Sequence, residues 1–134
     1  MTSPPTVSAA RLSGCANFAS VRPGPESGTV AVPDWGLTLR TAAPWREGVS
    51  AVGIRAGRVR PAREGDVNVF RCLTVRAVED VSSIQAELRP EGADPAAPPL
   101  WMELAKESWA SLPDRTQLLA AVRPEDLMLL EGGI

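Results

Sequence analysis

The sequence contains no histidine, no tyrosine and only one lysine, Lys106, among its 134 residues. Without histidine, the chain has no imidazole to act as a general base, a pH switch or a metal ligand. A Walker A phosphate-binding loop needs a lysine between glycine and serine or threonine. Lys106 instead follows Ala105 and precedes Glu107. We therefore expect no catalytic residues, no metal site and no nucleotide hydrolysis by this chain.

Cysteine is also scarce, with only Cys15 and Cys72 present. Two cysteines are too few for a disulfide scaffold, and both lie in apolar runs, so we expect reduced, buried thiols. No apolar run approaches the roughly 18 residues of a membrane-spanning helix. The first twelve residues lack the basic region of a secretory signal. A formal charge of -2 and a pI near 5.2 argue against nucleic-acid binding.

The chain does contain many short runs of Val, Ile, Leu and Thr that alternate with polar residues. Period-two alternation is typical of strands that have one wet face. Only one helix is expected, at 106–112, because Pro113 ends the pattern. The spacing of the runs favours small barrels or a sandwich. The expected strands are 15–22, 29–32, 35–40, 49–55, 67–80, 83–89, 100–105, 117–123 and 127–130.

Proline marks two segments that we expect to lack regular structure. Residues 1–9 are rich in Pro, Ser and Thr, and we predict a disordered lead-in there. Residues 90–99 contain four prolines, which exclude a helix or a central strand. This second segment is predicted to be an exposed loop at the tip of a hairpin.

The sequence also contains an internal repeat. Residues 52–59 (VGIRAGRV) align with residues 120–127 (AAVRPEDL), 68 positions later, and a strand with a tryptophan precedes each copy. Each half opens with an asparagine close to an aromatic residue, Asn17 or Asn68. We interpret the repeat as a twofold duplication. The predicted units are 10–66 and 67–134, each a small barrel like an oligonucleotide/oligosaccharide-binding (OB) fold, with strands exchanged between the halves.

The strings GCANF, DWGLTLR, VGIR, NVFRCLTVRAVED and VRPEDLMLL, over about residues 10–131, resemble the TOBE region of ABC-importer ATP-binding subunits. TOBE domains follow the nucleotide-binding domain in importers of molybdate, tungstate, sulfate and sugars. The resemblance implies an all-β fold of two small OB-like barrels in tandem, with one short helix in the second half. LSGCA at 12–16 lacks the paired glycines of the ABC signature, so ATPase activity would reside in a separate nucleotide-binding domain.

The second half is similar to the molybdate-type, or Mop-like, TOBE unit. In stand-alone Mop proteins, oxyanions sit between subunits on backbone amides and on Ser, Arg or Lys side chains. The resemblance carries an oxyanion-binding role to Asn68, Arg71, Lys106, Ser108 and Arg123. From the residues alone, Arg123 equally well bonds turn carbonyls or a nearby carboxylate, and Lys106 with Ser108 equally well forms a helix cap with a solvated lysine.

Two functions remain open from the sequence. The first is a non-catalytic regulatory and dimerisation domain of an importer's ATP-binding subunit, with no cofactor. Its implied partners are a second copy, the nucleotide-binding domain and the permease, at the cytoplasmic face of the membrane. The second is a stand-alone Mop-like protein that binds molybdate, tungstate or sulfate. An OB-type nucleic-acid binder is a third reading, which the acidic pI disfavours.

Overall fold

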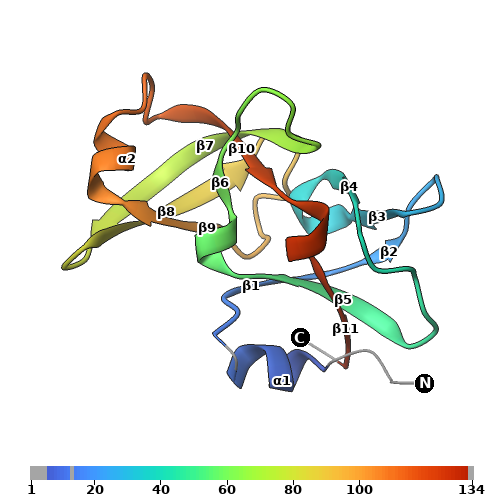
Figure 1. Ribbon diagram of the computed structural model, residues 1–134. Coiled ribbons are helices and arrows are strands. Elements are labelled where there is room, and N and C mark those ends of the chain that lie inside the picture. The colour runs from blue at the N-terminus through green and yellow to red at the C-terminus, as the bar shows by residue number, and fades with distance from the viewer. Residues whose placement is uncertain (1–5, 13, 133–134) are drawn as a thin grey trace.

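The computed structural model describes residues 6–12 and 14–132, and the chain is mostly β-structure (Figure 1). The strands are β1 (Asn17–Ser20), β2 (Arg22–Pro23), β3 (Thr29–Val32), β4 (Leu37–Arg40), β5 (Val49–Ile54), β6 (Arg60–Pro61), β7 (Asn68–Glu79), β8 (Ser83–Pro90), β9 (Leu100–Ala105), β10 (Gln117–Val122) and β11 (Met128–Glu131). The helices are α1 (Val7–Leu12) and α2 (Lys106–Ala110), with short 3-10 turns η1 (Pro33–Trp35), η2 (Ala56–Arg58) and η3 (Pro124–Asp126).

These strands form three sheets, in the orders β1-β5-β11, β6-β10-β7-β8-β9 and β2-β3-β4. The sheets curve into nearly closed, OB-like barrels, which confirms the predicted all-β class. The strand from 100 to 105 has the predicted bounds, and the helix predicted at 106–112 is α2. The proline-rich segment predicted at 90–99 connects β8 and β9, but the prediction is wrong for Pro90, which ends β8 opposite Cys72.

The two halves exchange their last strands in a reciprocal way. Strand β6 from the first half pairs with β10, where Arg60 lies opposite Ala121. Strand β11 from the end of the chain pairs with β5, where Met128 lies opposite Gly53. The two pairings are equivalent in the repeat. Met128 lies 68 residues after Arg60, and Gly53 lies 68 residues before Ala121. The boundary between residues 66 and 67 stays a prediction.

One continuous apolar core joins the halves. It contains Val30, Trp35 and Leu39 from the first half together with Leu88 and Met102 from the second. Trp35 and Met102 are almost fully buried. Because both halves share this core, neither one buries its apolar side chains by itself.

The predicted disordered lead-in at 1–9 is wrong for residues 7–9, which belong to α1, while residues 1–5 lie outside the described part of the chain. Val7 and Ala10 share one face of this helix and pack on Ala51 and Leu130. The hydroxyl oxygen of Thr6 accepts a hydrogen bond from the Ala9 amide at 3.0 Å, which satisfies one free donor of the first turn. The described residues thus contain two helices rather than one.

Three local features also differ from the sequence analysis. The run at 15–22 breaks at Val21, so β1 and β2 join different sheets. Trp35 lies in η1 rather than in a strand. Strand β6 was not predicted, because two residues with one proline carry no alternation and acquire strand geometry only by pairing with β10.

We predict that Gly36→Ala strongly destabilises the fold. Gly36 has a φ of +64°, and an added Cβ would clash with the carbonyl oxygen of Gly92 in the proline-rich loop. Strain and overpacking together should lower the free energy of unfolding by roughly 3 kcal/mol. Gly65→Ala is the matched control, since Gly65 has a φ of +88° but open space around it, and should cost only about 1 kcal/mol. Equal losses in urea titrations of the two variants would contradict the clash.

We also predict a pH-dependent role for Asp66, in the segment that joins the halves. Asp66 accepts two hydrogen bonds from the Arg60 guanidinium, at 2.8 and 2.9 Å, and one from the Arg63 amide at 2.6 Å. The Arg60 side chain, and then the Arg63 amide, lower the pKa of Asp66 from 3.8 to about 2. Because this folded-state pKa is depressed, the stabilisation is present above about pH 4 and is lost as the pH falls through 2.

The variant Asp66→Asn should therefore unfold at lower urea concentration than the wild type at pH 7. The difference in urea midpoint between the two proteins should disappear as the pH approaches 2. Glu64→Gln, at an exposed neighbouring position, is the control and should follow the wild type at every pH. A difference in urea midpoint that persists unchanged at pH 2 would contradict the role assigned to the Asp66 carboxylate.

Candidate functional site

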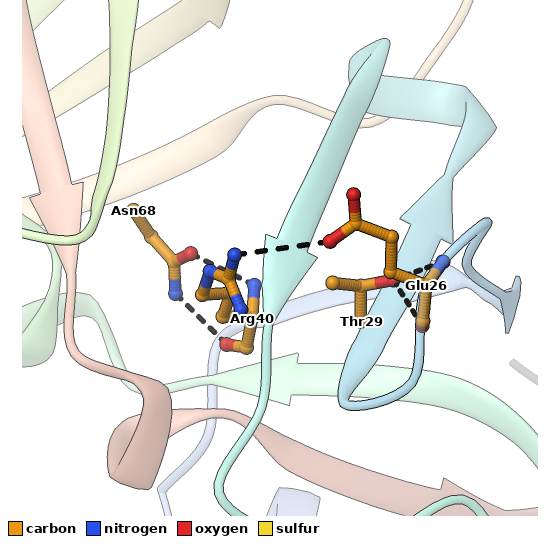
Figure 2. Close-up of polar contacts among 4 residues, drawn as sticks. All are labelled: Glu26, Thr29, Arg40 and Asn68. Carbon is orange, nitrogen blue, oxygen red and sulfur yellow. Dashed lines mark hydrogen bonds and ion pairs between the residues drawn. The ribbon is translucent and has the colours of Figure 1, made fainter.

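Asn68 is a buried polar side chain at the start of β7, and its amide binds the backbone of the other half of the chain. Its Nδ2 donates to the Arg40 carbonyl oxygen at 2.9 Å, and its Oδ1 accepts from the Arg40 amide at 2.8 Å (Figure 2). Asn68 is only 4% exposed. The two bonds satisfy the donor and the acceptor of the last residue of β4. Asn68 is therefore a connector between the halves.

Asn17 makes the same contact in the opposite direction. Its Nδ2 donates to the Trp101 carbonyl oxygen at 2.8 Å, and its Oδ1 accepts from the Trp101 amide at 2.7 Å. Asn17 pairs with Ile54 and Asn68 pairs with Val122 in their sheets, and these two partners are 68 residues apart. The asparagines are thus equivalent positions of the repeat. The sequence marked both as repeat openings but offered only Asn68 as a site residue.

Arg40 lies beside Asn68, although the sequence analysis did not select it. Its guanidinium Nη2 lies 3.8 Å from the Glu26 carboxylate, at an exposed turn (Figure 2). Thr29 shapes this turn: its hydroxyl donates to the Glu26 carbonyl oxygen at 2.7 Å and accepts from the Glu26 amide at 3.3 Å. The resemblance gave no signal for Arg40, because the residue belongs to the first half and meets Asn68 only through the fold.

Arg71 and Lys106 are both engaged by carboxylates of the same chain. Arg71 Nε lies 3.5 Å from the Glu91 carboxylate, and Lys106 Nζ lies 3.0 Å from the Glu79 carboxylate. All four side chains are more than one-third exposed, so each pair contributes about 1 kcal/mol or less. An incoming anion would compete with these carboxylates for the two cations.

Ser108 and Arg123 are exposed. The Ser108 carbonyl oxygen accepts a hydrogen bond from the Ser111 hydroxyl at 2.9 Å, and α2 is only five residues long. Arg123 directly follows the end of β10, next to the pair formed by Val122 and Asn68. Among the predicted cations, Arg123 is the one whose side chain makes no ion pair within residues 6–12 and 14–132. Asp126 instead pairs with Arg58, at 3.9 Å.

The five predicted residues do not converge within one chain. Asn68 and Arg123 are neighbours, and Arg71 lies about 10 Å further along β7. Lys106 pairs with Glu79 at the far end of the same strand, roughly 35 Å from Asn68 at the usual rise per residue. The fold therefore brings together Asn68, Arg123 and Arg40, and separates them from α2.

Both cysteines are buried, as predicted, and neither forms a disulfide in the structure. Burial raises the pKa of Cys72 to about 12. Burial also raises the pKa of Cys15, against smaller opposing effects led by its contact with the Asn17 backbone. At neutral pH neither thiol forms appreciable thiolate, so neither is a reactive nucleophile.

In the described part of the chain, no helix is long and apolar enough to cross a membrane.

Fold and side chains together define an all-β protein of OB-like barrels, with a buried asparagine at the start of each half. Neither a protein-family model nor a curated protein matches the sequence. Among solved structures, the chain is similar to ModG, described as a cytoplasmic molybdate-binding protein and crystallised with molybdate bound. The TM-score is 0.63 at 13% identity, over 88% of this chain and 97% of that chain. At this identity the likeness establishes the fold.

We predict that the two asparagines stabilise the protein equally. Asn68→Ala removes a buried amide and the two hydrogen bonds that it makes to the backbone of Arg40, and Asn17→Ala does the same at Trp101. Each variant should lower the free energy of unfolding by about 2–4 kcal/mol, measured by urea titration. Gln117→Ala, which removes an exposed amide, is the control and should change it by less than about 0.5 kcal/mol. A small loss at either asparagine would contradict their equivalence.

Proposed function

We propose that the chain is a non-catalytic, Mop-like protein that binds a small tetrahedral oxyanion of the molybdate and tungstate class. The observation that carries this proposal is the likeness to ModG, which spans nearly the whole of both chains. The match therefore extends over most of this chain and of ModG, rather than over a short segment of either. A cytoplasmic location follows from the same proposal.

Arg123 is the residue that we assign to the anion, with Asn68 holding the neighbouring backbone in place. Arg123 is exposed, makes no ion pair in the described residues and directly follows Val122, the strand partner of Asn68. An arginine offers two parallel N–H groups that match a pair of oxyanion oxygens. Arg55, at the end of the equivalent strand β5 and next to the partner of Asn17, is the corresponding position in the first half.

One arginine alone does not hold an oxyanion tightly. A charge-assisted hydrogen bond contributes about 1.5–3 kcal/mol, while association costs at least about 4 kcal/mol. The described chain places Lys106 and Ser108 far from Arg123, so one copy does not supply the missing donors from α2. In the proposed complex these donors come from α2 of another copy, as the resemblance to Mop proteins implies.

We predict that isothermal titration calorimetry detects micromolar binding of molybdate or tungstate, at an integral stoichiometry per chain. Arg123→Gln should weaken the affinity at least tenfold, because it removes the cation at the site. Arg115→Gln, which changes an exposed arginine in the turn before β10, is the matched control and should bind like the wild type. A folded wild-type protein that gives no heat with either anion at millimolar concentration would refute oxyanion binding.

The regulatory and dimerisation domain of an ABC-importer ATP-binding subunit is the second candidate. Its support is that Asn68, Arg71 and Lys106 already have partners within the chain, as expected for residues with structural roles. In that case the partners are a nucleotide-binding domain and a permease, and the protein acts at the cytoplasmic face of the membrane. This candidate would be favoured if titration with molybdate and tungstate gave no heat of binding and if an ATP-binding cassette were encoded upstream in the same reading frame.

A further inference from the structure

Strand β7 exposes large apolar side chains on the face that points away from the core. Val69, Leu73, Val75 and Val78 of β7 are 41–49% exposed, and Leu119 of β10 is 48% exposed. We call these five residues the β7 face. Leu119 lies directly opposite Arg71 in the pairing of β10 with β7, between Val69 and Leu73, so it belongs to the same surface.

The opposite side of β7 faces the core. Phe70 and Cys72 are buried there, and they alternate with the exposed Val69, Arg71 and Leu73. A strand that is apolar on both faces is typical of a sheet covered by a layer on each side. In the described chain, the core covers one side of β7, and the exposed fractions show that the other side is open to solvent.

The apolar exposure is concentrated rather than scattered. Nine large hydrophobic residues of the described chain are exposed, and seven of them lie on the β7 face, just before β7 at Val67 or at the β7–β8 turn at Val81. Monomeric soluble proteins rarely expose a contiguous apolar patch of more than a few hundred Å². Twelve residues of β7 and three strands give a surface of roughly 40 by 15 Å, the same order as the about 800 Å² per partner of a stable interface.

Two of the three arginines on this surface are paired with glutamates, while Arg89, opposite Leu73, makes no ion pair within the described residues. Arg71 pairs with Glu91 at 3.5 Å, and Arg76 pairs with Glu87 at 2.9 Å, while the Arg76 guanidinium also lies 5.5 Å from the Trp101 ring centroid. A nucleic acid or an anionic membrane would need an excess of positive charge here. A surface of exposed valine and leucine side chains, on which two of three arginines are already paired, instead suits a partner surface of the same kind.

We infer that the β7 face binds the β7 face of a second copy, forming a twofold dimer. In a twofold contact each copy presents the same patch, so apolar side chains meet apolar side chains and each ion pair can regroup with its symmetry mate. Two such sheets would pack face to face at about 10 Å, as in a β-sandwich. The inference rests on the sheet surface and not on the proposed oxyanion function.

The test is sedimentation equilibrium of the full chain between about 1 and 200 μM, with the wild type and two variants. The wild type should be dimeric at the upper concentrations. Leu73→Lys places a charge in the centre of the β7 face at a half-exposed position and should raise the dimer dissociation constant at least tenfold. Leu12→Lys makes the same change at a residue that is 90% exposed on α1, and should leave the constant unchanged.

Urea titration checks that the Leu73→Lys monomer is as folded as the Leu12→Lys control. A wild type that is monomeric at 200 μM overturns the inference, as does a dimer that Leu73→Lys does not weaken. A dimer that Leu73→Lys does not weaken leaves the oxyanion proposal standing, because calorimetry with molybdate reads that property separately. A strictly monomeric wild type would count against both, since the proposed oxyanion site takes α2 from another copy. Conversely, a dimer that forms and binds no oxyanion would support the β7 interface and refute only the proposed ligand.

Discussion

The fold depends on two buried asparagine side chains that each bind a strand of the opposite half. Asn17 satisfies the backbone of Trp101, and Asn68 satisfies the backbone of Arg40. A buried amide or carbonyl without a partner costs about 1–3 kcal/mol, so neither half can separate without losing several such bonds. The exchange of β6 and β11 between the halves adds backbone pairing to the same junction. The chain is therefore one cooperative unit built from two similar pieces.

This constraint also limits where a ligand can bind. The amide of Asn68 uses its donor and its acceptor on Arg40, so it orients a neighbouring segment rather than contacting an anion with those atoms. Arg123 follows the strand that pairs with Asn68, which fixes the backbone from which its guanidinium extends. The other predicted donors lie on α2, beyond the far end of β7. Any complete oxyanion site must then combine separate surfaces, and assembly of several copies is the simplest way to do so.

Sequence alone predicted the features that depend on local alternation. The long run at 67–80, the hairpin after it and the strand at 100–105 follow directly from period-two patterns. The features that it missed depend on distant partners: β6 is a strand only because of β10, and α1 is ordered by packing on Ala51 and Leu130. For the site, the repeat pointed to Asn17 and Asn68. Spacing could not reveal that Asn68 and the lysine on α2 lie at opposite ends of the twelve-residue strand β7.

Strand β7 links these properties in one element. Its first residue joins the halves, its inner side chains complete the core, and its outer side chains form an apolar surface. Binding of an anion near Arg123 would change the assembly of two copies only if the anion had different affinities for the two arrangements. The pairing of Asn68 with Val122 puts Arg123, the residue proposed to bind the anion, directly after a strand that borders β7. A movement of β7 would therefore affect both the segment that carries Arg123 and the β7 face. Anion binding could in this way change the association of two copies without any catalytic step.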